Sequence, residues 1–196
     1  MKAVYIVNDM KIAKILIDPM RRAILDLLRQ KPMTQAGLAN ELGLTGASLN
    51  HHMKMLRSNK LVTIFKREVE RHRIMQIFLT SVAYLFVYDL DSLPKNVARY
   101  FYPVSLERAR ALVSLLLMYN KEFDIEQTPE TINTISEDLS RHLVMAARPY
   151  EKRIINHGDE RYVYEIYAKA MTNLLNETKK QLSSTQRKKY NFLCQD

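Results

Sequence analysis

Apolar residues recur at intervals of three and four positions in three consecutive stretches, residues 18–31, 34–42 and 45–57. This spacing places the apolar side chains on one face of a helix and leaves the polar side chains on the other face. The pattern therefore predicts three short amphipathic helices that pack against one another.

The expected ends of these helices carry residues that favour helix ends. Asp18, Thr34 and Thr45 each offer a side-chain oxygen that can accept a hydrogen bond from a free amide of the first turn. Gly43 can adopt the positive φ that ends a helix. A helix, a glycine-containing turn and a second helix in direct succession are typical of the helix-turn-helix motif.

The hydrophobic period changes after the third helix. Residues 61–65 and 73–79 are rich in β-branched and aromatic side chains, which predicts two strands on either side of the charged segment 66–72. Two such strands after a helix-turn-helix make a wing. Residues 4–7 predict a further short strand, whereas residues 82–88 are apolar on both faces and leave a buried strand and a buried helix equally open.

The rest of the chain is predicted to be helical. Ser105 can cap a helix that runs to Met118, Thr128 precedes another, and a last helix ends near Leu182. The predicted fold class is mainly α with a small β-wing. We expect a winged helix-turn-helix domain at residues 1–80, followed by an apolar segment with a hinge at residues 81–94. A helical dimerisation domain that could bind an effector is expected at residues 95–182, and a flexible basic tail at residues 183–196.

The net charge of +9 is concentrated at one end of the chain. Residues 1–80 contain 14 Lys and Arg against 6 Asp and Glu, whereas residues 81–196 contain 16 against 15. A basic module attracts polyanions, chiefly nucleic acid. Because the same charge could serve solubility alone, it supports nucleic-acid binding only together with the motif.

Several other classes of protein do not fit the sequence. No apolar run is long enough to span a bilayer or to act as a secretory signal, and the single cysteine, Cys194, can form neither an intrachain disulfide nor a zinc cluster. The sequence contains no glycine-rich phosphate loop and no HExxH or GxSxG motif. We therefore expect a cytoplasmic, nucleoid-associated protein that is not an enzyme, has no cofactor and does not bind membranes.

The third predicted helix separates two sets of side chains. Leu49, Met53 and Leu56 define its buried face, and His52 falls at the edge of that face, where we expect it to pack against the second helix. The outward face carries a small residue, an amide, an imidazole and an ammonium, from Ala47, Asn50, His51 and Lys54.

This outward face suits the major groove of double-stranded DNA. A small side chain permits close approach, asparagine can form two hydrogen bonds with adenine, histidine can donate to guanine, and lysine can reach guanine or a phosphate. A helix that only packs would also have a polar face, but here that face coincides with the motif, the wing and the basic charge. The predicted contacts of the phosphates and of the wing are Thr34, Thr45, Arg57, Lys66, Arg67, Arg71 and Arg73.

The segments IDPMRRAILDLL, MTQAGLANELGLTGASLNHHMKML and LVTIFKR resemble an ArsR-like winged-helix transcriptional regulator, especially archaeal members with a helical region after the wing. The resemblance covers residues 4–80 well and the remainder in outline. It implies a homodimer that regulates transcription, with residues 45–56 in the major groove. It also implies that the base-reading positions fall on Gly46, Ala47, Ser48, Asn50 and His51, to which the helical pattern adds Lys54.

Metal-sensing members of that family carry ligands that this sequence lacks. Residues 39–43, which read ANELG, stand where such sensors have a cysteine pair. His142 and His157 do not have the helical spacing that brings two ligands together. We therefore expect no metal effector, while a small-molecule effector stays open.

The second half offers candidates for a dimer contact. The segment 106–118 is apolar nearly all round, which favours burial on more than one side. The tyrosines of the last helix could line a ligand pocket, but their helical spacing favours packing. The dimer candidates are Leu112, Leu115, Leu116, Tyr164 and Tyr167.

Two functions other than sequence-specific regulation stay open. A winged-helix module can bind protein or RNA of the transcription machinery without reading bases. A chromatin-like protein can bind DNA without sequence preference. The salt dependence and sequence preference of duplex binding distinguish these functions.

Overall fold

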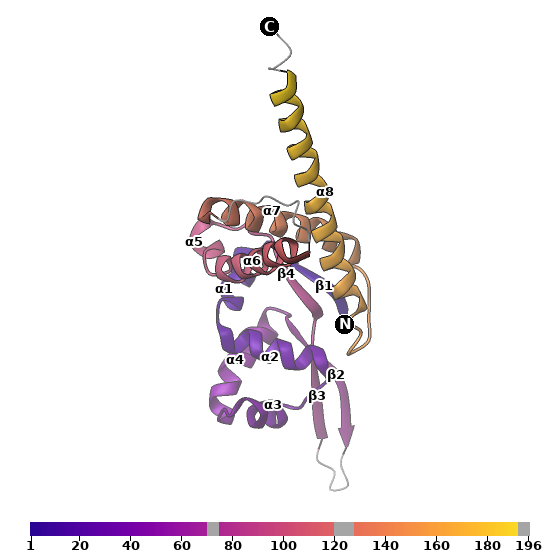
Figure 1. The fold of residues 1–196 in the computed structure, drawn as a ribbon. Coiled ribbons are helices and arrows are strands. Elements are labelled where there is room, and N and C mark those ends of the chain that lie inside the picture. Colours follow the sequence, from indigo (N-terminus) through magenta and orange to yellow (C-terminus); the bar gives the residue numbers. More distant parts are fainter. Residues whose placement is uncertain (70–74, 120–127, 192–196) are drawn as a thin grey trace.

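The computed structural model describes residues 1–69, 75–119 and 128–191. The apolar core forms two clusters. The first lies mainly among the helices of the first sixty residues and includes residues 93–101, and the second lies among the helices of the second half. A small parallel sheet lies between them and contributes side chains to both (Figure 1). The chain is mostly helical with a small antiparallel sheet, as the sequence predicts.

The three predicted amphipathic helices are present and follow a short first helix. Asp18, Thr34 and Thr45 each accept a hydrogen bond from an amide of the following first turn, so the three predicted caps are confirmed. Gly43 adopts a φ of 63° and ends its helix, also as predicted. The bounds are α1 Met10–Leu16, α2 Pro19–Gln30, α3 Gln35–Leu42 and α4 Gly46–Ser58.

Two antiparallel strands form a ribbon that extends beyond the helices (Figure 1). They are β2 (Val62–Val69) and β3 (Met75–Ser81), so the predicted wing strands are confirmed, and β2 includes charged residues that the hydrophobic pattern did not assign to it. At the base of the ribbon, Leu79 also pairs with Met33, just before α3. The wing is therefore anchored to the helices through backbone hydrogen bonds.

The ambiguous apolar segment is a strand. It forms β4 (Ala83–Tyr88), which pairs in parallel with β1 (Lys2–Val7). Both faces of β4 are apolar because they meet different clusters: Phe86 packs against the first, whereas Leu85 and Val87 belong to the second. The strand predicted at residues 4–7 is confirmed in the same sheet.

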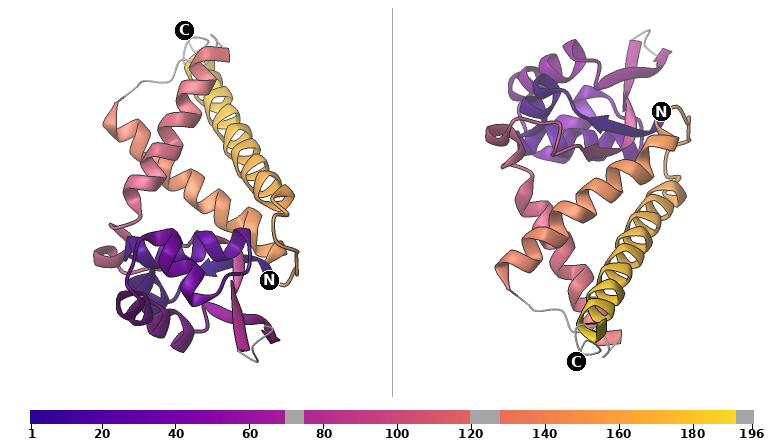
Figure 2. Two further views of the ribbon diagram at one scale, coloured as in Figure 1. Left: turned by 90° about the horizontal axis from the view of Figure 1, so that it is seen from below. Right: turned by 90° about the horizontal axis from the view of Figure 1, so that it is seen from above.

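The second half of the described chain is helical. The bounds are α5 Lys95–Ala98, α6 Tyr102–Tyr119, α7 Pro129–Ala147, the 3-10 turn η1 Arg148–Tyr150 and α8 Arg161–Asn191. The helix α7 contacts both α6 and α8, and the three enclose a triangle in the views of Figure 2. The helix α8 continues past the predicted end near Leu182 and projects away from the body (Figure 1). Among the described residues, no helix combines the length and hydrophobicity of a membrane span.

The cap predicted at Ser105 is wrong. The helix α6 already begins at Tyr102, so Ser105 lies inside its first turn, and it is buried. Its hydroxyl donates to the Ser136 carbonyl oxygen at 3.2 Å and lies 2.5 Å from Oγ of Ser140. A buried hydroxyl needs a hydrogen-bond partner, and here the partners are on α7 instead of the first turn of α6.

The two glycines around the turn before α4 offer a test of this geometry. A Cβ added at either Gly43 or Gly46 would meet no atom within 4 Å, so only the backbone conformation differs. Gly43→Ala should lower the free energy of unfolding by about 1 kcal/mol, because its φ is positive. Gly46→Ala should leave it unchanged or raise it. Urea unfolding measures both, and equal effects would contradict the assignment of the turn.

Candidate nucleic-acid interface

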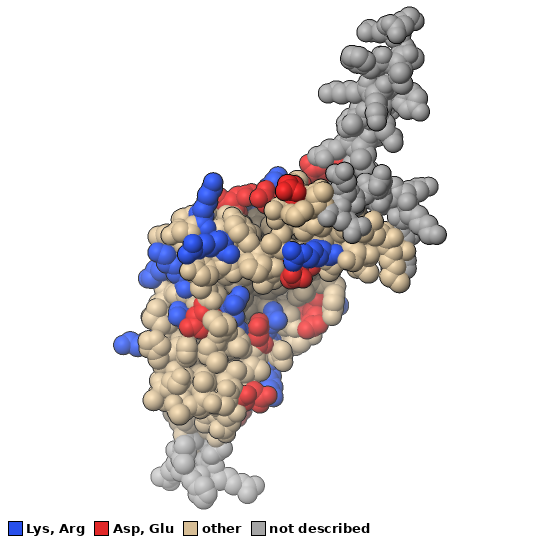
Figure 3. Space-filling model, turned by 60° about the vertical axis from the view of Figure 1, so that its left-hand side comes forward, with Lys and Arg blue, Asp and Glu red and all other residues tan. Residues whose placement is uncertain are grey.

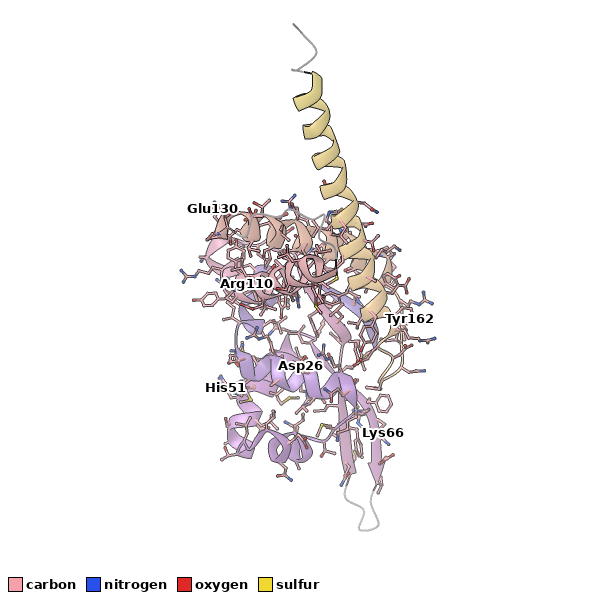
Figure 4. All side chains as sticks on the ribbon, viewed as in Figure 1. Asp26, His51, Lys66, Arg110, Glu130 and Tyr162 are labelled. Atoms are coloured by element: carbon pink, nitrogen blue, oxygen red, sulfur yellow. The ribbon has the colours of Figure 1, made fainter. Side chains whose placement is uncertain are left out.

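The helix α4 presents a polar face to solvent. Leu49, Met53 and Leu56 are buried against the first cluster, which fixes the rotation of the helix about its axis. The predicted exposure of the opposite face is confirmed, and Figure 4 shows His51 at the outer side of the domain. The exposed residues are Gly46, Ala47, Ser48, Asn50, His51, Lys54 and Arg57.

The side chain of Asn50 is held by a neighbouring helix. Nε2 of Gln35, the first residue of α3, donates to Oδ1 of Asn50 at 2.9 Å. The amide of Asn50 therefore has a defined orientation, and its NH2 group remains available to an outside acceptor. The sequence did not predict this role of Gln35. The signal in the sequence that could have indicated it is a long polar residue directly after the Thr34 cap.

The N-terminus of α4 is suited to an anion. Thr45 Oγ1 accepts from the Ser48 amide at 3.2 Å, which leaves the hydroxyl proton free to donate outward. The first turn contains no acidic residue, so its free amides and the helix dipole keep their attraction for a phosphate. Thr34 caps α3 in the same way, with the Gly37 amide at 3.1 Å, although Thr34 is half-buried.

His52 faces the protein, as the sequence predicts, but its polar contact is with the start of α2 and not with α3, the helix against which it was expected to pack. Its Nδ1 lies 3.7 Å from Oδ2 of Asp18, the N-cap of α2. The same carboxylate accepts from the Arg21 guanidinium at 3.1 Å. Burial alone would raise the pKa of Asp18, but the backbone and side-chain hydrogen bonds from Arg21, with the charges of Arg21 and His52, lower it below its usual value. These contacts join the N-terminus of α2 to the inner face of α4.

The wing combines charged and apolar side chains. Lys66 forms an ion pair with Glu68 and lies 4.7 Å from the centre of the Phe78 ring, so its ammonium group is already engaged. Arg67 is exposed and stands opposite Ile77. Of the other wing residues predicted to contact DNA, Arg71 and Arg73 lie outside the described residues.

One face of the wing is apolar, which sequence reasoning missed. The strand register places Arg67 on the same side as Val69, Met75 and Ile77. Those three side chains are 67%, 59% and 39% exposed, so they are not covered within the chain. Charged residues stand between these apolar residues along the strands, so the hydrophobic pattern of the sequence did not indicate an apolar face.

The face drawn in Figure 3 is unevenly charged. Lys and Arg side chains lie over its upper part, whereas the lower part of the described surface on this face carries few charged side chains. Part of the excess charge of residues 1–80 lies outside α4, because Arg21 is paired with Asp18 and because Arg22 and Arg29 line a cavity at the junction of the two clusters. On α4 itself, Lys54 and Arg57 are exposed and no acidic residue is present, so this helix contributes both polar groups and positive charge.

The candidate dimer residues fall into two groups. Leu112 is buried in the chain's own second cluster, against which Leu116 and Tyr167 also pack. Leu115 and Tyr164 are 54% and 67% exposed. The role of all five in dimerisation stays a prediction.

His142 and His157, which lack the spacing of metal ligands in the sequence, lie in separate surroundings. Nε2 of His142 is 2.8 Å from Glu177 Oε2, and Nε2 of His157 is 2.8 Å from the Thr80 hydroxyl. Within the described ranges, no three histidine, cysteine or acidic side chains come close enough to hold a metal ion.

Comparison with protein-family models identifies a domain in the first part of the chain. A family model described as a helix-turn-helix domain matches residues 16–64. Residues 16–64 form a helix-turn-helix domain. The chain is also similar to the crystal structure of NolR from Sinorhizobium fredii, with 22% identity, a TM-score of 0.31 and coverage of 56% of this chain and 81% of that one. No curated protein sequence matches the chain.

The Asp18 contacts generate a pH-dependent prediction. A carboxylate whose pKa is lowered in the folded state stabilises the fold above its usual value of 3.8, and this stabilisation is lost as the pH falls through the lowered pKa. Asp18→Asn keeps a capping side chain but removes the charge. It should therefore lower the free energy of unfolding above about pH 4 and have little effect in stronger acid.

Urea unfolding between neutral pH and strong acid measures this difference. The same substitution in an Arg21→Gln background is the control, and there the pH dependence should be smaller, because the guanidinium hydrogen bond and charge are missing while the backbone amide of residue 21 still donates. A difference that stays constant over the whole pH range would contradict a stabilising ion pair at Asp18.

Proposed function

We propose that this chain is a sequence-specific double-stranded DNA-binding transcriptional regulator that acts as a homodimer. In this proposal α4 enters the major groove, and the wing lies on the flanking backbone or in the minor groove. The observation that carries the proposal is the outward face of α4, where Asn50, His51 and Lys54 are exposed on a helix whose opposite face is fully packed.

Base reading would use side chains of different lengths. Ala47, near the start of α4, lets the backbone approach the base edges, and Asn50 can form two hydrogen bonds with adenine. Gln35 takes one lone pair of Asn50 Oδ1, and the second lone pair stays free for the adenine amino group. His51 and Lys54 lie on the same exposed face and can donate to guanine.

Phosphate contacts would position α4 in the groove. The hydroxyl protons of Thr45 and Thr34 and the free amides at the start of α4 can all donate to phosphate oxygens. Arg57 is exposed in the last turn of α4 and can reach the next phosphates along the groove. In the wing, Arg67 supplies a guanidinium without a carboxylate partner among the described residues, whereas Lys66 would first have to leave Glu68.

Dimerisation would use the second half of the chain. Leu115 on α6 and Tyr164 on α8 are large exposed side chains, and α8 projects well beyond the body (Figure 1). A two-fold dimer would carry two copies of α4 that read half-sites about 34 Å apart, or a multiple of that distance. The symmetry of the operator would then match the symmetry of the protein.

A second candidate follows from the wing. Val69, Met75 and Ile77 form an exposed apolar face, and such a face favours docking on a protein over binding to DNA. The chain would then be a winged-helix module that docks on a component of the transcription machinery. Duplex selection separates the two candidates, because only a regulator enriches a defined sequence from a random pool.

Base reading by α4 and phosphate binding by the wing can be tested by comparing binding to a duplex enriched from a random pool, called the selected site, with binding to random duplexes. Asn50→Ala or His51→Ala should reduce the preference for the selected site by about 1–3 kcal/mol and should change random-duplex binding little. Arg67→Ala should weaken binding to all duplexes similarly and should reduce the salt slope by about one. Gln35→Ala should relax the preference at the same base pair as Asn50→Ala.

The control for these variants is Lys95→Ala, which removes an exposed lysine from α5, away from α4 and the wing. Electrophoretic mobility shifts at several salt concentrations measure the four variants and the control. Equal losses on selected and random DNA for Asn50→Ala and Arg67→Ala would contradict base reading by α4.

The dimer is tested separately from DNA binding. Leu115→Asp and Tyr164→Asp should each shift the chain toward monomer in sedimentation velocity, because a charge at a buried contact is costly. Met10→Asp is the matched control, since Met10 is 45% exposed on α1. A wild-type chain that sediments as a monomer at the concentrations that bind DNA would rule out the homodimer.

A further inference from the structure

A cavity of about 350 Å³ lies at the junction of the two halves of the molecule. Its walls come from α2, β4, α6, α7 and α8, so residues next to both apolar clusters contribute to it. The volume falls within the range of about 300–1,000 Å³ that is typical of small-molecule sites. The residues proposed to contact DNA do not line it.

The charged side chains of the cavity are mostly arginines. Arg22, Asp26 and Arg29 come from α2, and Arg108 comes from α6. The Asp26 carboxylate is 3.3 Å from the Arg29 guanidinium. Neither Arg22 nor Arg108 forms an ion pair with a carboxylate of the described residues. Each half therefore contributes one guanidinium whose charge no salt bridge neutralises.

Arg22 and Asp26 from α2, Tyr88 from β4 and Arg108 from α6 all line this one cavity. Burial raises the pKa of the Tyr88 hydroxyl to about 12, the positive charges of Arg22 and Arg108 oppose this rise, and the charge of Asp26 adds to it. Figure 4 shows Asp26 on α2, below the helix α6 on which Arg110 is labelled.

An apolar surface stands beside these charges. The rings of Tyr88 and Phe101 are stacked, with their centres 4.0 Å apart and an interplanar angle of 21°, and both residues line the cavity. Leu25 from α2 adds aliphatic surface. Tyr167 on α8 also lines the cavity, and the Arg108 guanidinium lies 5.5 Å from the centre of its ring. The cavity thus joins two unneutralised guanidiniums to an aromatic wall.

We propose that this cavity binds a small organic anion with a flat apolar body, such as an aromatic carboxylate. The acid group would lie between Arg22 and Arg108, and the body would lie against Tyr88 and Phe101. A cation would meet three guanidiniums and one carboxylate, and a neutral ligand would bury charged groups without compensation. The bound anion contacts α2 of the helix-turn-helix domain and α6 of the second half, so its binding stabilises their contact. Binding of this anion does not require that the chain bind DNA.

The test uses two acids and their neutral amides as probes. Calorimetric titration of the full chain with indole-3-acetate and benzoate should give saturable binding at low salt, and indole-3-acetamide and benzamide should bind at least about tenfold more weakly. Arg22→Gln and Arg108→Gln should each weaken binding of the acids by about tenfold. Arg110→Gln is the matched control on α6, because Arg110 is exposed, pairs with Glu107 and does not line the cavity.

A cavity-filling variant locates the site. Val104 lines the cavity and is 45% exposed, so Val104→Trp can be accommodated at its rim and should abolish binding of both acids. Thermal unfolding checks that each variant is folded, and indole-3-acetate should raise the melting temperature of the wild type but not of Arg22→Gln. The proposal is overturned if neither acid binds at millimolar concentration, if the amides bind equally well, or if Arg22→Gln, Arg108→Gln and Val104→Trp bind the acids as the wild type does.

Discussion

The parallel pairing of β1 with β4 is the contact on which the rest of the molecule depends. Parallel neighbours cannot be joined by a tight turn, and here the connection between them is the entire winged helix-turn-helix. The two strands hold the beginning and the end of that domain side by side. They also present one face to each apolar cluster, so packing in one half constrains packing in the other. Residues of β4 line the junction cavity together with residues of α2, α6, α7 and α8, so the cavity lies where the two clusters meet at this sheet.

Features that depend on a few neighbouring residues could be predicted from the sequence. The caps at Asp18, Thr34 and Thr45 are such features, because each oxygen bonds an amide of the next turn. Ser105 also offers a side-chain hydroxyl, but it does not cap a helix, because it is buried against α7 and donates to a carbonyl oxygen of that helix. The strand β4 could not be assigned from the sequence. Both of its faces are apolar because each meets a different apolar cluster, and the sequence pattern does not show the second cluster.

In the candidate site, too, features set by neighbouring residues could be predicted, whereas features set by contacts between distant segments could not. The outward direction of His51 and the inward direction of His52 follow from the helical period, and the structure agrees with both. The engagement of Lys66 with Phe78 depends on strand register, which the hydrophobic pattern did not determine. The meeting of Arg22 and Arg108 depends on the parallel sheet that joins the halves. The positions of these two arginines in the sequence do not predict that they line the same cavity.

The hydrogen bond from Gln35 to Asn50 has a consequence for how recognition could change over evolution. A free asparagine loses rotamer entropy when it binds a base, whereas one already held by a neighbour loses less. Under the proposed function, affinity for an adenine then depends partly on a residue that need not touch DNA. Substitutions at position 35 could broaden or narrow the set of recognised sites while every base-contacting side chain stays the same.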